Sequence, residues 1–149
     1  MSSVAIRARG LTLHRPWPWA FTHADKRVEN RKWRPEGMRG WWLLLHAGAA
    51  FDQEGWDAMR EGRFGEAAKS VPAAHPSGVI VAVAKLDGVA PYLESDDPWA
   101  FGPFVWRLSG LVVLPSPVEC RGFQKLWRAP QEALDAVNAQ FDNGVELVR

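Results

Sequence analysis

Residues 13–48 constrain the fold more than any other part of the chain. This segment, LHRPWPWAFTHADKRVENRKWRPEGMRGWWLLLHAG, holds five of the nine tryptophans in the 149 residues. It also holds a dense run of ionisable residues that includes Lys26, Glu29, Arg31 and Arg34. Tryptophan is usually found in a core or a binding surface, and charged side chains are usually exposed. A segment that interleaves both types is typical of a wall between a hydrophobic core and a ligand.

The overall composition predicts one globular domain over residues 1–149, with its core at about residues 10–142. Hydrophobic residues make up 47% of the chain and charged residues 23%, which excludes a disordered chain. The chain has no apolar run near the roughly 18–20 residues of a spanning helix, and MSSVAIRARG lacks the apolar centre of a signal peptide. We therefore expect a cytoplasmic protein without membrane contact. Cys120 is the only cysteine, which excludes an internal disulfide and a thiolate metal cluster.

The net charge of +1 conceals an uneven distribution along the chain. Residues 1–40 carry nine Lys or Arg and three acids, whereas residues 41–100 carry four Lys or Arg and nine acids. A basic block that contains the aromatic-rich segment is typical of a surface that meets phosphate. The alternative is a solvated basic face that pairs with the acidic middle of the chain, and charge alone does not separate the two.

The hydrophobic pattern predicts several strands and three helices. Strands are expected at residues 10–14, 41–46, 78–86, 104–108 and 110–114, and helices at 17–24, 52–69 and 131–141. Turns are expected at Asp87-Gly88 and Ser109-Gly110, strand ends at Pro115 and Pro117, a helix break near Gly62, and irregular chain at residues 1–10, 90–102 and 118–128. This order favours an α+β domain built on a small mixed, mostly antiparallel β-barrel flanked by helices.

The residues from 26 to 33 are expected to form a strand or an extended loop. Alternate side chains of an extended chain share one face, so Glu29, Arg31 and Trp33 would point the same way. Lys26 lies at the corner between the preceding helix and this segment, close enough to join that row. The pattern therefore predicts a carboxylate, two cations and an indole side by side.

The same segment resembles the ASCH domain, a member of the PUA-like superfamily. ASCH domains carry the motif Gly-x-Lys-x-x-Glu-x-Arg, which reads ADKRVENR at residues 24–31, with Ala24 in place of the glycine. Family positions before and after the motif are matched by Pro16-Trp17, Trp33, Arg39-Gly40 and His46-Ala47. Weaker similarities follow at Gly102-Pro103, Trp106, Arg121-Gly122 and Leu126-Trp127.

The resemblance implies a small β-barrel with helices beside a cleft that the motif residues line. The superfamily is associated with RNA binding and with recognition of modified bases. Some small proteins similar to this domain hydrolyse N4-acetylcytidine through a lysine, a threonine and a glutamate, and others look like metal-dependent ribonucleases. Lys26 matches that lysine, whereas Glu29 stands at the position of the threonine.

The residue types support recognition of a base or a phosphate. Lys26 and Arg31 are suited to a phosphate or a base carbonyl, and Glu29 to the amino group of cytosine or adenine. Trp17 and Trp33 are suited to stacking on an unpaired base. The alternative is a structural Glu29–Arg31 ion pair with both tryptophans in the core.

We therefore expect an RNA-binding or modified-nucleoside-binding site. The expected binding residues are Trp17, Lys26, Glu29, Arg31, Trp33, Arg34 and His46. For an enzyme, an amidohydrolase on acylated cytidine or a ribonuclease, Lys26 and Glu29 are the candidate catalytic residues. We expect no cofactor and no metal, because His14, His23, His46 and His75 show no paired spacing. A protein-interaction module that uses the acidic residues 87–98 is the remaining alternative.

Overall fold

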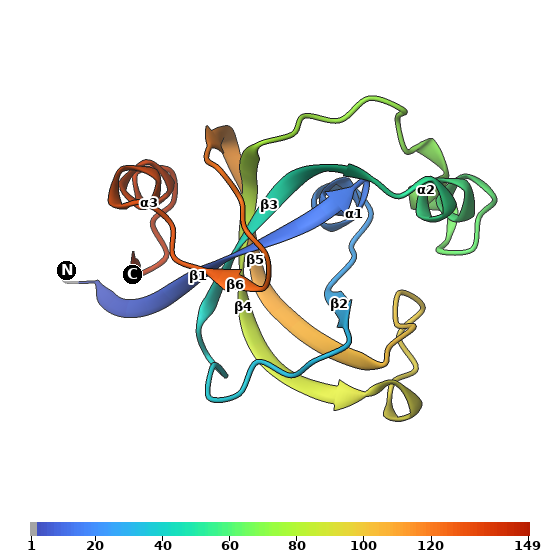
Figure 1. Cartoon of the computed structure of the whole chain (residues 1–149), viewed down its shortest axis with the longest axis horizontal. Helices are drawn as coiled ribbons and strands as arrows, with labels where there is room; N and C mark the ends of the chain where they lie inside the picture. The colour runs from blue at the N-terminus through green and yellow to red at the C-terminus, as the bar shows by residue number, and fades with distance from the viewer. Residues whose placement is uncertain (1–2) are drawn as a thin grey trace.

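The computed structural model of the chain describes residues 3–149 and shows a small α+β domain with a seven-stranded mixed sheet and three α-helices (Figure 1). The strands are β1 (Val4–Arg15), β2 (Val28–Arg31), β3 (Trp42–Phe51), β4 (Val79–Pro91), β5 (Phe104–Glu119), β6 (Leu126–Trp127) and β7 (Val145–Val148). The helices are α1 (Trp17–His23), α2 (Gln53–Arg60) and α3 (Gln131–Asn138), with 3-10 turns η1 (Glu66–Ser70) and η2 (Tyr92–Glu94). Within the described residues, no helix combines the length and apolar character needed to cross a lipid bilayer.

The sheet is an open path of paired strands in the order β2-β5-β4-β3-β1-β6, and β7 pairs with β1. The β1–β3 and β1–β7 pairs are parallel, and the other pairs are antiparallel. In residues 3–149 no backbone pairing joins β2 to β1 or β6, so the closed barrel expected from the sequence is not confirmed. The mixed sheet itself is confirmed.

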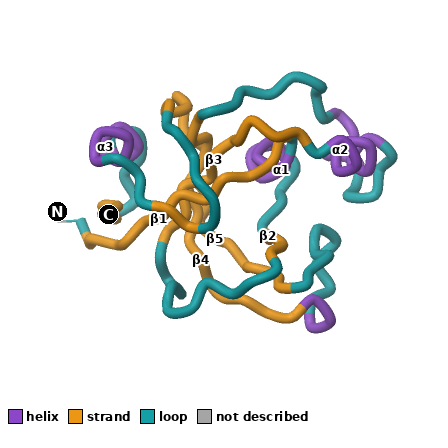
Figure 2. The backbone as a smooth tube through the Cα atoms, viewed as in Figure 1, coloured by secondary structure: helices purple, strands orange, loops and turns teal. Residues whose placement is uncertain are grey.

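The strand β3 is buried on both faces, as the run WWLLLH predicts. Leu43 and Leu45 lie in one hydrophobic cluster with Trp106, whereas Trp42 and Leu44 lie in another beneath α3. A third cluster joins α1, α2 and η1. Figure 2 shows the strands gathered in the middle of the molecule, with α2 and α3 at its periphery.

The two ends of the chain differ from the prediction, because strand pairing orders residues expected to be irregular. β1 begins at Val4 rather than near Gly10, and its first residues pair with β7, which the sequence pattern did not predict. The beginning of β1 and the C-terminus lie on the side of the molecule that carries α3 (Figure 1). Ala8 and Leu147 are buried against α3, so the core extends beyond the predicted limits of residues 10–142.

The expected turns at Asp87-Gly88 and Ser109-Gly110 are wrong, because both dipeptides form β-bulges within long strands. Asp87 is the extra residue between the Leu86–Leu108 and Gly88–Arg107 pairs. Gly110 lies at a second register shift, where β5 has one residue more than β4. Its φ of 60° is a left-handed conformation that glycine adopts without strain, so the bulge forms there. The local signals were correct for a backbone irregularity, but the strand pairing converts each turn into a bulge.

Pro115 and Pro117 do not end β5, which also corrects the prediction. Ile80 pairs with Val118 and Ala82 with Val113, so residues 114–117 of β5 lie opposite Val81 alone. Inside such a wide bulge the proline nitrogens are not needed for ladder hydrogen bonds. The helical predictions fared better: α1 is confirmed, the break near Gly62 separates α2 from η1, and α3 ends three residues early at Asn138.

Candidate functional site

Lys26 follows α1 at a sharp change of direction in the backbone. The left-handed conformation at this corner belongs to Asp25, with a φ of 58°, whereas Ala24 has a φ of −130°. Aspartate tolerates the left-handed region better than most residues. Ala24, which stands at the position of the motif glycine, is therefore unstrained. The turn forms here without a glycine at residue 24.

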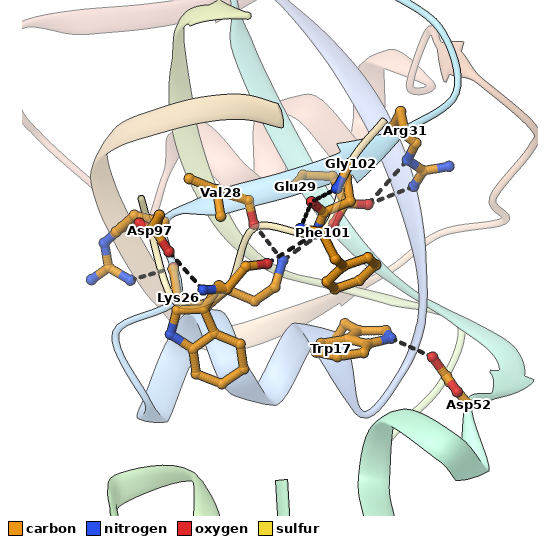
Figure 3. Close-up of polar contacts among 12 residues, drawn as sticks. Trp17, Lys26, Val28, Glu29, Arg31, Asp52, Asp97, Phe101 and Gly102 are labelled. Carbon is orange, nitrogen blue, oxygen red and sulfur yellow. Dashed lines mark hydrogen bonds and ion pairs between the residues drawn. The ribbon is translucent and has the colours of Figure 1, made fainter. Parts of the chain in front are cut away.

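The Lys26 side chain is 1% exposed and lies between backbone, carboxylate and aromatic rings. Its Nζ donates to the Val28 carbonyl and lies 3.3 Å from Glu29 Oε1 (Figure 3). It also lies 4.3 Å from the ring centroid of Phe21 and 5.5 Å from that of Trp17. The hydrogen bonds and the aromatic faces partly offset the loss of hydration of the ammonium group.

Burial lowers the pKa of Lys26 below the usual range of a lysine. The neighbouring Glu29 and Asp97 carboxylates oppose this shift, and the Arg31 guanidinium adds to it. The amine therefore loses its proton more readily than a lysine at the surface.

Glu29 bridges two cations, because β2 presents Glu29 and Arg31 on the same face. Arg31 Nε donates to Glu29 Oε2 at 3.0 Å, and Arg31 Nη2 lies 3.0 Å from the same oxygen as its ion-pair partner, while Lys26 Nζ donates to Oε1. The Arg31 Nη2 also donates to the Thr12 carbonyl of β1 at 3.0 Å. The row of charges predicted from the alternation of an extended chain is thus present.

These charges and two aromatic rings line one pocket of about 240 Å³. Its lining is formed by Thr12, Leu13, His14, Trp17, Lys26, Glu29, Asn30, Arg31, Asp52 and Phe101. Phe101 is 53% exposed, and its ring centroid lies 6.0 Å from that of Trp17 (Figure 3). We call this hollow the charged pocket.

Six lining residues were not among the predicted site residues: Thr12, Leu13, His14, Asn30, Asp52 and Phe101. Asn30 fixes the loop that carries Phe101: it donates to the Trp99 carbonyl at 3.1 Å and accepts from the Phe101 and Gly102 amides at 2.8 and 2.9 Å. Asp52 lies directly before the first residue of α2. It caps α2 through the Gly55 amide and also accepts from Trp17 Nε1 at 2.9 Å. The sequence carries no signal for these long-range contacts, although Asn30 lies inside the motif.

Trp33 and Arg34 lie outside the charged pocket. Trp33 packs edge-on against Trp106, with ring centroids 4.9 Å apart, and its carbonyl accepts from Trp106 Nε1. Arg34 is exposed beside the Phe104 ring and lines a different hollow. The two residues follow the end of β2, so the alternation that aligns Glu29 with Arg31 no longer places them.

His46 also lies outside the charged pocket, within a chain of hydrogen bonds. Its Nε2 donates to the Cys120 carbonyl at 2.6 Å, so its Nδ1 accepts from the Thr12 hydroxyl, which in turn accepts from Trp127 Nε1. Burial lowers the pKa of His46, and the bond to the Cys120 carbonyl opposes that shift. His46 is 2% exposed and therefore contributes to packing between β1, β3 and β6.

The charged pocket combines the partly exposed guanidinium of Arg31 with the rings of Trp17 and Phe101. In residues 3–149, no three His, Cys, Asp or Glu side chains lie close enough together to hold a metal ion. The chain matches no known family model, and no curated protein is similar to it at a significant level. The ASCH resemblance therefore remains a prediction that depends on the motif residues.

Proposed function

We propose that the protein binds the base of an RNA nucleotide or of a modified nucleoside in the charged pocket. The observation that carries this proposal is the meeting of Lys26, Glu29 and Arg31 with the rings of Trp17 and Phe101 around one hollow. A base needs an aromatic face for stacking and polar groups at its edge, and this pocket holds both. Its volume of about 240 Å³ suits a single base rather than a duplex.

The charges also favour a ligand over a purely structural role. Glu29 already accepts from Lys26 and Arg31, yet the Arg31 side chain is 24% exposed. The guanidinium has five N–H donors, and its hydrogen bonds within residues 3–149 use two of its three nitrogens. Donors that remain at the mouth of the pocket are suited to a base carbonyl or a phosphate.

Calorimetric titration with cytidine, N4-acetylcytidine, uridine and a short single-stranded RNA tests the proposal. Phe101→Ala removes an exposed ring without opening the core. If the ring stacks on a base, we expect a loss of about 1–3 kcal/mol in binding free energy. Glu29→Gln keeps the shape of the side chain and should shift the preference among the bases.

Lys69→Ala is the matched control for Lys26→Ala, because Lys69 forms the same i,i+3 ion pair with Glu66 at the surface. We expect Lys26→Ala to weaken binding and Lys69→Ala to leave it unchanged. The proposal fails if the wild-type protein binds none of the four ligands at low salt. Equal losses in both lysine variants would also count against it.

The lowered pKa of Lys26 favours a second candidate function, hydrolysis of an acylated cytidine. In that reaction water adds to the acyl carbon, the bond to N4 breaks, and cytidine and a carboxylate are released. A neutral Lys26 amine or the Glu29 carboxylate would take the proton from water and return it to N4 as the bond to N4 breaks. Chromatography after incubation with N4-acetylcytidine tests this activity, since unchanged substrate rejects it. A separate incubation with RNA tests the ribonuclease alternative, which degradation of the RNA would indicate.

A further inference from the structure

A second hollow of about 250 Å³ lies on the side of the sheet where the β2–β3 connection meets β4 and β5. Three exposed arginines line it: Arg34 and Arg39 from the connection and Arg107 from β5. Glu36 is the one acidic residue in its lining. We call this hollow the arginine pocket.

The three guanidinium groups have few partners within the protein: Glu36 shares their hollow, and Arg107 also lines a neighbouring hollow with Glu94, Asp96 and Asp97. No ion pair between described residues involves Arg34, Arg39 or Arg107, and none of them donates a side-chain hydrogen bond to another described residue. By contrast, Arg15 and Arg27 each donate to backbone carbonyls. Three like charges around one hollow repel one another, and a bound anion relieves that repulsion.

Gly88 makes room for one of these groups. A Cβ atom at residue 88 would lie 2.5 Å from Arg107 Nη2, closer than van der Waals contact allows. Gly88 follows the extra residue of the β4 bulge and pairs with Arg107 across the strands. Because Gly88 has no side chain, the Arg107 guanidinium has space over the backbone of β4.

The arginine pocket is close to the charged pocket along the chain. Arg31 lines the charged pocket and Arg34 the arginine pocket, and three residues span at most about 11 Å. A single strand is therefore long enough to reach both pockets.

We infer that the arginine pocket binds phosphodiester groups of a single-stranded nucleic acid. This inference rests on the proposed function, because it extends a base site into a site for a strand. Guanidinium groups bind phosphate oxygens through paired N–H donors, and such contacts position a strand without reading its sequence. The preferred ligand is then an oligonucleotide rather than a free nucleoside.

Fluorescence anisotropy with a labelled single-stranded RNA at several salt concentrations tests the inference. The variant Arg34→Gln/Arg39→Gln/Arg107→Gln removes the three charges, and Arg7→Gln/Arg60→Gln/Arg63→Gln removes three exposed arginines elsewhere. For three lost phosphate contacts on a single strand, the slope of log K against log salt should flatten by about 2. The control variant at residues 7, 60 and 63 should keep the wild-type slope. Calorimetry should show that both variants bind a free nucleoside with unchanged affinity.

Gly88→Ala separates geometry from charge, because it displaces the Arg107 guanidinium without altering the net charge. We expect a higher Kd for RNA and an unchanged Kd for the nucleoside. The inference is overturned if the arginine variant keeps the wild-type slope, if the control loses as much, or if Gly88→Ala leaves RNA binding unchanged. RNA binding no tighter than nucleoside binding overturns it alone, whereas binding of neither ligand overturns the proposed function as well.

Discussion

Lys26 is the residue on which the charged pocket depends most. A lysine that is 1% exposed is unusual, and here a carbonyl, a carboxylate and two aromatic rings surround it. The loss of hydration is only partly compensated, since burial lowers the pKa of the amine. The free energy of unfolding therefore depends on whether Lys26, which lines the charged pocket, is protonated.

Lys26→Met tests this coupling through the pH dependence of stability. Because the pKa of Lys26 is lower in the folded protein, the unfolded chain binds more protons between that pKa and the ordinary value of 10.5. The free energy of unfolding of the wild type should therefore rise, relative to Lys26→Met, as pH increases through that window. Urea unfolding at a series of pH values measures the difference.

Lys69→Met serves as the control, because Lys69 is exposed and paired with Glu66. Its stability curve should run parallel to that of the wild type. If the Lys26→Met curve is also parallel to that of the wild type, burial of Lys26 does not disfavour its charged form.

At the scale of elements, one asparagine of β2 holds the loop after η2. Asn30 uses both its donor and its acceptor on backbone groups of residues 99–102, and this places Phe101 beside Trp17. An acidic loop without apolar periodicity acquires a defined conformation in this way. The wall of the charged pocket is therefore built by two segments about seventy residues apart in the chain.

Asn30→Ala should free this loop and lower the free energy of unfolding by about 1–3 kcal/mol, since three backbone groups of residues 99–102, two of them partly buried, lose their partners. Hydrogen exchange at the Phe101 and Gly102 amides should accelerate. Asn30→Asp keeps the acceptor and should preserve most of that protection.

Asn138→Ala is the matched control for Asn30→Ala. Asn138 bonds both backbone groups of Leu147 in the same manner, at the opposite side of the domain. It should lose stability without faster exchange at Phe101 or weaker ligand binding. Unchanged exchange at Phe101 in Asn30→Ala would show that other contacts hold the loop.

At the scale of the whole molecule, a side chain connects strands that the backbone leaves unpaired. β2 ends the path of the sheet and β1 lies near its other end, yet Arg31 of β2 donates to the Thr12 carbonyl of β1. The sheet therefore curves until these strands face each other across the charged pocket. The same guanidinium serves both the curvature of the sheet and the proposed binding site.

Arg31→Met should lower the free energy of unfolding by about 1.5–3 kcal/mol, because a charged donor leaves Glu29 and the Thr12 carbonyl. Arg31→Lys should recover only part of this loss, since an ammonium group lacks the planar fork. Urea unfolding measures both. Arg63→Met removes an exposed ion pair with Glu61 and should change stability by less than about 1 kcal/mol. An equal loss in Arg31→Met and Arg63→Met would exclude a bridging role.

Local sequence determined much of this protein. The apolar spacing of residues 17–24 determined α1, and the run WWLLLH determined a strand buried on both faces. The alternation from Lys26 to Arg31 determined the row of charges. These features depend on contacts between residues close in sequence, where helix and strand periodicity decides which side chains share a face.

Tertiary structure decided the bulges, the length of β5 and the lining of the charged pocket, because these features depend on pairings between distant segments. Strand pairing turned the Asp87-Gly88 and Ser109-Gly110 signals into bulges and admitted Pro115 and Pro117 into β5. Long-range packing also brought Asp52 and Phe101 to Trp17 and kept His46 out of the charged pocket. No local pattern encodes which distant carbonyl or ring a side chain will meet, since that follows only from how the sheet curves and which strands it joins.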